Sequence, residues 1–277
     1  AVELEYGSNA DKKAGAFKLD GGTGRFAWHV NGYARDQGDY TSPAERPVEE
    51  DDHDDHEGEH EEEFETGTVD NSFTSAEGAT VGFSYVTDRG YLGLAVGGYN
   101  TDFGIPGHHH HGEEEGHGGE DDHDNHEGEH EEEAGVASQL EQRRVDLHSQ
   151  IDNPFGGFSA ARFSAGWRDY QHEEIEGDQV GTRFENQWAE ARLDLVTRKL
   201  LGFEGTMGLQ YVNRDFAAFG DEAFVMPTDT TRLGAYIFEQ TPTDPVSFQW
   251  GLRYDHQDTK SSNPELPDRD FKTWTAS

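Results

Sequence analysis

Hydrophobic and polar residues alternate with a period of two along much of this chain. In residues 187–196 the apolar positions are Ala189, Ala191, Leu193 and Leu195, and the polar positions between them are Glu190, Arg192 and Asp194. The same alternation recurs in residues 24–35, 144–151 and 246–254. Because successive side chains of a β-strand point to opposite faces, this period predicts strands with one apolar and one polar face.

Segments of this kind predict about twelve strands, many of them longer than the five or six residues usual in soluble sheets. We expect them at 2–7, 14–20, 24–37, 76–87, 90–103, 139–151, 157–171, 182–196, 203–214, 230–241, 246–258 and 271–277. Roughly 9–11 residues are enough for a tilted strand to cross a bilayer. We therefore predict an all-β fold, an antiparallel transmembrane β-barrel segment, with residues 1–277 forming one partial barrel domain.

The connections between these strands alternate in length. The short ones lie at 21–23, 88–89, 152–156, 198–202 and 242–245, and the longer ones at 8–13, 38–75, 104–138, 172–181, 215–229 and 259–270. Outer-membrane barrels have short periplasmic turns and long extracellular loops, so we expect the long loops outside the cell. A soluble antiparallel sandwich or propeller would also alternate, but a dry core tolerates charges at strand centres poorly.

Two of the long loops carry most of the negative charge. The net charge is -37, and residues 49–63 and 113–133 hold eleven and twelve acidic residues without a basic one. Such a field attracts cations and repels phosphates, which argues against nucleic acid as a partner. Because the loops lack apolar anchors, we expect 38–75 and 104–138 to be disordered without metal.

The same loops contain a direct repeat, DDHDDHEGEHEEE at 51–63 and DDHDNHEGEHEEE at 121–133. Imidazole nitrogen suits zinc, nickel and copper, while carboxylates supply oxygen ligands and neutralise the ion. Calcium, the alternative for an acidic tract, prefers oxygen to imidazole. We therefore predict a divalent metal, zinc in the first place and nickel or copper as alternatives. The candidate ligands are His53, His56, His60, His108, His109, His110, His111, His117, His123, His126 and His130.

Four histidines lie outside these loops and are weaker candidates. His29 and His148 are expected on the polar face of their strands, and His172 and His256 near the loop-side ends. Each could pass metal inward or could be an ordinary polar group of the lumen. Asp255 beside His256, and Glu173 with Glu174 after His172, would suit shared coordination.

Several kinds of protein are not supported by the sequence. Cysteine is absent, so there is no disulfide framework, thiolate metal site or cysteine nucleophile. No run of 18 apolar residues exists, which argues against a transmembrane helix. There is no serine-hydrolase, zinc-protease or phosphate-loop motif, and we predict that the chain is not an enzyme.

With these features in place, the chain resembles the TonB-dependent outer-membrane receptors, and among them the zinc-uptake type with His/Asp/Glu-rich extracellular loops. The resemblance rests on EYGS at 5–8, KLDGGTGRFAWHVNGYARD at 18–36, GLRYDH at 251–256 and the two acidic tracts, and it covers essentially the whole chain. It implies a 22-stranded barrel in the bacterial outer membrane and a plug that couples uptake to the TonB complex. Neither plug nor TonB box is found in these residues, so we expect a fragment or a processed chain.

Three functions from different classes remain open at the level of sequence. The first is a transporter segment whose loops capture zinc for TonB-dependent uptake, with the membrane lipid and divalent metal ions as its partners. The second is a surface β-protein that buffers metal or adheres without transporting anything. The third is a soluble, acidic, calcium-binding sandwich, which calcium would reveal by outcompeting zinc.

Overall fold

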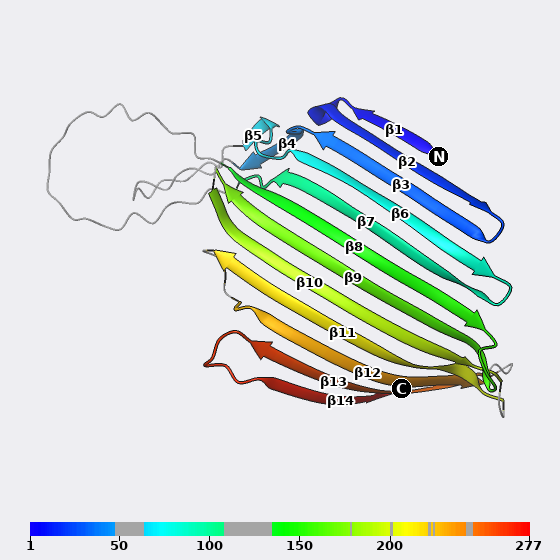
Figure 1. The fold of residues 1–277 in the computed structure, drawn as a ribbon. Helices are drawn as coiled ribbons and strands as arrows, with labels where there is room; N and C mark the ends of the chain where they lie inside the picture. The colour runs from blue at the N-terminus through cyan, green and yellow to red at the C-terminus, as the bar shows by residue number, and fades with distance from the viewer. Residues whose placement is uncertain are drawn as a thin grey trace, which may run out of the picture.

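The chain folds as a twelve-stranded antiparallel sheet in the order β1-β2-β3-β6-β7-β8-β9-β10-β11-β12-β13-β14 (Figure 1). The computed structural model describes residues 1–47, 64–107, 135–177, 179–199, 202–220, 223, 225–241 and 246–277. The strands are β1 Val2–Gly7, β2 Lys12–Thr23, β3 Phe26–Gln37, β6 Thr74–Thr87, β7 Gly90–Gly104, β8 Val136–Asp152, β9 Phe158–Glu176, β10 Gln179–Thr197, β11 Glu204–Gly220, β12 Thr228–Thr241, β13 Phe248–Ser261 and β14 Arg269–Ala276. The predicted all-β class and the twelve strands are confirmed.

The strand ends differ from the prediction mainly at the long-loop edge. The expected link at 172–181 is wrong, because β9 continues to Glu176 and β10 begins at Gln179. The expected link at 215–229 shortens in the same way, since β11 runs to Gly220. At the end of β9 both faces carry mostly polar side chains, so the alternation stops although the backbone ladder continues. At the end of β11 the alternation stops for the opposite reason, because residues 216–219 are apolar on both faces.

The register assigns every strand residue to one of two faces, because directly paired residues of neighbouring strands lie on the same side. One row across the sheet runs Phe83, Leu94, Leu147, Ala165, Ala191 through successive strand pairs. We call the side of these residues the apolar face and the opposite side the polar face. Along the strands, rows of the apolar face turn polar toward the long-loop edge, as at Arg143, Asp169, Gln187, Asp215 and Asp229.

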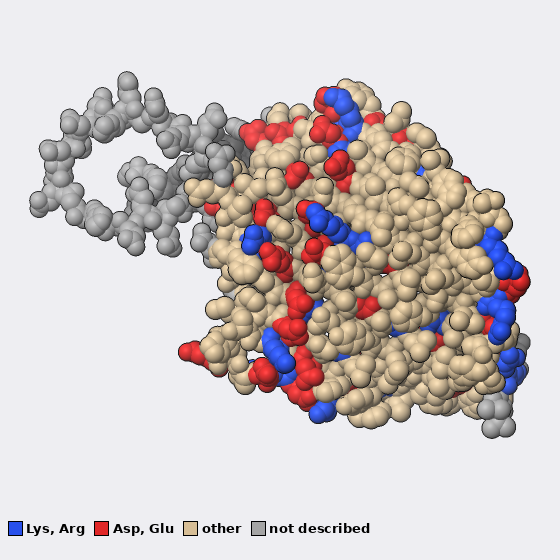
Figure 2. Space-filling model, viewed as in Figure 1, with Lys and Arg blue, Asp and Glu red and all other residues tan. Residues whose placement is uncertain are grey.

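The apolar face is largely uncovered. Leu94, Leu209 and Leu233 are each about half exposed, at 48%, 53% and 53%. Among the described residues the buried hydrophobic side chains are only Val69, Val136, Ala160 and Ala218, so the sheet has no inner core of its own. Figure 2 shows a mostly uncharged area between charged atoms near the long-loop edge and further charged atoms, most of them basic, at the opposite edge. A sheet with a broad, exposed apolar band is suited to contact with lipid.

The short-turn edge is fixed by arginines that bind neighbouring turns. Arg89 donates to the carbonyl of Asn153 at 2.6 Å, and Arg198 donates to the Asn153 Oδ1 atom at 2.6 Å. Asn153 has a φ of 51°, a left-handed conformation that asparagine adopts more readily than most residues. Three consecutive turns are therefore held together at this edge.

At the long-loop edge, the ends of the 38–75 link form a small separate hairpin. It pairs β4 (Thr41–Pro47) with β5 (Phe64–Thr68) in a two-stranded sheet. The sequence analysis did not anticipate these strands. No helix in the described parts of the chain is long and apolar enough to cross a membrane.

Candidate functional site

The polar face carries a network of paired charges. Asp146 on β8 accepts a hydrogen bond from Arg168 on β9 at 2.9 Å, and its carboxylate is 19% exposed. Arg253 on β13 donates two hydrogen bonds to Asp255, at 2.6 and 2.7 Å. Charges at strand centres are stable here because they have partners and remain in reach of water. This is the chemistry expected of a hydrated lumen wall.

His29 and His148 both lie on this polar face, as predicted. They line one hollow of about 420 Å³, together with Asp20 and Asp146. The Nδ1 atom of His29 contacts Asp20 Oδ1 at 2.5 Å, and Asn31 Nδ2 lies 2.6 Å from the other ring nitrogen. Neighbouring strands are about 4.8 Å apart, and three such spacings separate β3 from β8. The structure therefore brings the two histidines into one hollow but not into one coordination sphere.

His172 also lies on the polar face, near the loop-side end of β9. Its Nε2 atom is 2.6 Å from the hydroxyl of Ser138, which is only 1% exposed. The ring also packs against Phe184, with centroids 5.5 Å apart. Glu173 points to the other face, where Gln171 donates to it at 2.7 Å. His172 and Glu173 therefore do not converge, whereas Glu174 shares the histidine's face.

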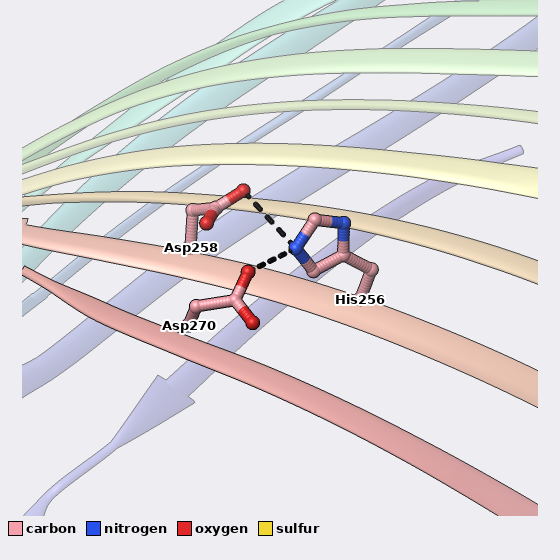
Figure 3. A group of neighbouring side chains, drawn as sticks. All are labelled: His256, Asp258 and Asp270. Carbon is pink, nitrogen blue, oxygen red and sulfur yellow. Dashed lines mark hydrogen bonds and ion pairs between the residues drawn. The ribbon is translucent and has the colours of Figure 1, made fainter.

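His256 lies on the apolar face, because it pairs with Leu233 on β12 and Lys272 on β14. Its sequence neighbour Asp255 points to the polar face and binds Arg253. The expected pairing of Asp255 with His256 is therefore not formed. Instead, His256 approaches Asp258 and Asp270 (Figure 3). Over the described residues, this is the only group of three or more metal-ligating side chains that converges within 4.8 Å.

Sequence reasoning missed Asp258 and Asp270 for different reasons. Asp258 follows His256 by two residues, so the period of two already places both on one face. Asp270 is on another strand, and only the register, which pairs it with Asp258, brings it into the group. That register depends on the turn between β13 and β14, which the alternation does not specify.

The eleven histidines of the two long loops lie outside the described residues. The roots of these loops, however, are described and lie next to each other. Asn71, at the end of the first loop, donates to the carbonyls of Ile105 and Val136 at 3.0 and 2.6 Å. Ile105 and Val136 flank the second loop, and Ile105 N donates to Val136 O at 2.9 Å. One asparagine therefore ties the root of the first loop to both ends of the second.

No family model matches the sequence. Among solved structures, the chain is similar to "Copper transporter OprC" (TM-score 0.71, 12% identity), to the FrpB iron transporter from Neisseria meningitidis (F3-3 variant; 0.71, 11%) and to BauA, the ferric preacinetobactin receptor from Acinetobacter baumannii (0.66, 10%). Each match covers 99% of this chain but only 41%, 42% and 43% of the other chain. The chain thus spans about two fifths of the structures that it matches. At these identities the similarity shows the fold alone: a long-stranded antiparallel sheet that matches part of these transporter and receptor structures.

Proposed function

We propose that this chain is part of an outer-membrane receptor that captures a divalent transition metal on its extracellular loops for uptake into the cell. The observation that carries the proposal is the joint root of the two histidine-rich loops, held by Asn71 at one edge of a receptor-type wall. The exposed apolar face supports contact with outer-membrane lipid. The paired charges of the polar face support a hydrated interior.

Zinc is the metal that we propose for the loops. The repeated tracts offer imidazole nitrogen and carboxylate oxygen, both of which zinc accepts in tetrahedral sites. The whole chain contains no cysteine and only two methionines, so the soft sulfur donors that favour monovalent copper are scarce. Nickel and divalent copper share the nitrogen and oxygen donors and remain the competitors. The similar structures are named for copper transport, for iron transport and as a ferric preacinetobactin receptor, so proteins of this fold serve more than one metal.

Coupling to the TonB complex through a plug belongs to the same proposal. The matched structures are more than twice as long as this chain, and gating is a property of a whole receptor. The three similar proteins are named as transporters or receptors and none as an enzyme. This agrees with the expectation that the chain is not an enzyme.

The test is isothermal titration of the full chain in detergent with zinc, nickel, copper and calcium. We expect several equivalents of zinc at pH 7, little calcium, and a large loss of zinc binding near pH 5, because free imidazole protonates near pH 6.5. Replacing the eleven loop histidines by glutamine should remove most of this zinc. The matched control is His148→Gln, which removes an exposed histidine of the polar face.

The proposal fails if zinc binds no better than calcium, or if the eleven substitutions leave binding unchanged. Uptake of radioactive zinc by cells whose complete receptor carries the same substitutions distinguishes transport from mere metal buffering. If the protein only buffers metal, the substitutions reduce the zinc bound at the cell surface. The rate of zinc uptake driven by the proton-motive force then stays unchanged.

A further inference from the structure

His256, Asp258 and Asp270 form a compact group across the β13–β14 hairpin (Figure 3). The Nε2 atom of His256 lies 3.5 Å from Asp258 Oδ2 and forms a hydrogen bond with Asp270 Oδ2. One ligand atom from each of the three residues lies within 4.8 Å of the others. All three side chains are partly exposed, at 33%, 51% and 48%, so an ion can reach them from the solvent.

The register explains this convergence. His256 and Asp258 are two residues apart on one strand and therefore share a face. Asp258 pairs directly with Asp270 on β14, and like charges at directly opposed positions destabilise a sheet unless something neutralises them. Lys272 supplies part of that charge, with its Nζ atom 3.1 Å from Asp270 Oδ1. Two carboxylates thus face one ammonium group and one imidazole.

The group lies on the apolar face near its polar margin. Tyr254 and Trp274 pair with each other beside it, with ring centroids 4.8 Å apart. Their row belongs to the apolar face, and the row of Asp258 and Asp270 is the next but one toward the long-loop edge. His29 and His148 are on the opposite face. The group is therefore separate from the polar hollow that they line.

We propose that His256, Asp258 and Asp270 bind a divalent cation of the zinc type. A tetrahedral ion with bonds of about 2.0–2.1 Å places its ligand atoms roughly 3.3 Å apart, close to the separation of His256 from Asp258. Three protein ligands leave a fourth position for water. The Nε2 proton now bonded to Asp270 must leave, either to Nδ1 of the neutral ring or, from an imidazolium, to solvent. The bound ion connects β13 to β14 through side chains and neutralises the opposed carboxylates.

This site is tested in the full chain after the eleven loop histidines have been changed to glutamine. In that background we expect equilibrium dialysis to show one equivalent of bound zinc. Adding His256→Gln should remove it, and Asp270→Asn should weaken it by at least tenfold. Adding His148→Gln instead should leave it unchanged, because that histidine lies on the other face. Circular dichroism verifies that each variant keeps its β-structure. If one variant does not fold, the unsubstituted chain treated with a chelator serves as the metal-free reference.

Two results would overturn the site: no zinc in the chain without loop histidines, or one equivalent that survives His256→Gln. The outcome is independent of the proposed function. If the unsubstituted chain binds no more zinc than the variant without loop histidines, the loops are not the collectors, while the β13–β14 site stands.

Discussion

At the residue scale, the charged side chains of the polar face depend on oppositely charged partners, either in a neighbouring strand or two residues away in the same strand. Asp146 is the clearest case, because Arg168 donates to it at 2.9 Å and Arg144 lies at 3.9 Å. By contrast, Asp88 pairs with Arg25 at the short-turn edge and its side chain is 89% exposed. Solvent screens the second pair far more than the first.

We therefore expect Asp146→Asn to lower the free energy of unfolding by about 1.5 kcal/mol, a discounted value for a charge-assisted hydrogen bond in a half-buried site. The control Asp88→Asn should change it by less than about 0.5 kcal/mol. Urea unfolding in detergent, followed by tryptophan fluorescence, measures both values. Equal effects of the two substitutions would contradict the importance that we assign to burial.

The sequence predicted the faces of some residues well, and the reason is local. The alternation of Phe26, Trp28 and Val30 with His29 and Asn31 specifies the polar face for His29 without any knowledge of the neighbouring strand. Contacts between side chains of different strands could not be predicted in this way. That His256 would meet Asp270 and not Asp255 depends on register, which is a property of two strands and a turn.

At the scale of elements, the strand interiors were predictable and their loop-side ends were not. In β9 the apolar face ends at Trp167, and the next residues on that face are Asp169, Gln171 and Glu173. Without apolar residues there is no alternation to read, yet the backbone ladder with β8 continues to Glu176. Backbone hydrogen bonds between neighbouring strands extend these strands beyond the apolar band. The pattern of a single sequence does not encode those bonds.

Among the residues that hold elements together, Asn71 has the clearest predicted effect when it is substituted. It has a φ of 57° and joins two loop roots by side-chain hydrogen bonds. Asn71→Ala removes both bonds and places alanine in a left-handed conformation that it disfavours. We expect a local destabilisation of about 1.4 kcal/mol, which corresponds to tenfold faster hydrogen exchange of the Ile105 amide.

The matched control for this prediction is Asn9→Ala. Asn9 also joins two segments, since its side chain donates to Thr41 O at 3.1 Å and accepts from Thr41 N at 2.8 Å. Asn9 holds the start of the 38–75 link and not its end, so its substitution should leave the exchange of Ile105 unchanged. If Asn71→Ala has no greater effect on Ile105 than Asn9→Ala, the joint root does not depend on Asn71.

At the scale of the whole molecule, the two faces of the sheet face different solvents. Leu94 and Ala95 are neighbours in β7 but lie on opposite faces, with Leu94 paired to Leu147 and Ala95 paired to Asp146. An arginine near the middle of a lipid-facing surface costs about 2–4 kcal/mol. On the other face an arginine at 95 would lie beside the Asp146 carboxylate.

We expect Leu94→Arg to reduce insertion into lipid vesicles strongly and Ala95→Arg to insert like the unchanged chain. The inserted fraction can be measured by protection from protease and by the heat-dependent mobility of the folded protein in gel electrophoresis. If both variants insert equally well, the apolar face is not the one that contacts lipid.

The joint root at Asn71 also changes how the two repeated tracts would act on an ion. Two ligand arms that start from adjacent points meet each other at a local concentration on the order of millimolar, whatever the amount of protein in the membrane. An ion released by one arm would then be recaptured by the other before it diffuses away. The affinity of the pair would exceed that of either arm, so deleting one loop should cost far more than half of the zinc retained at low metal concentration.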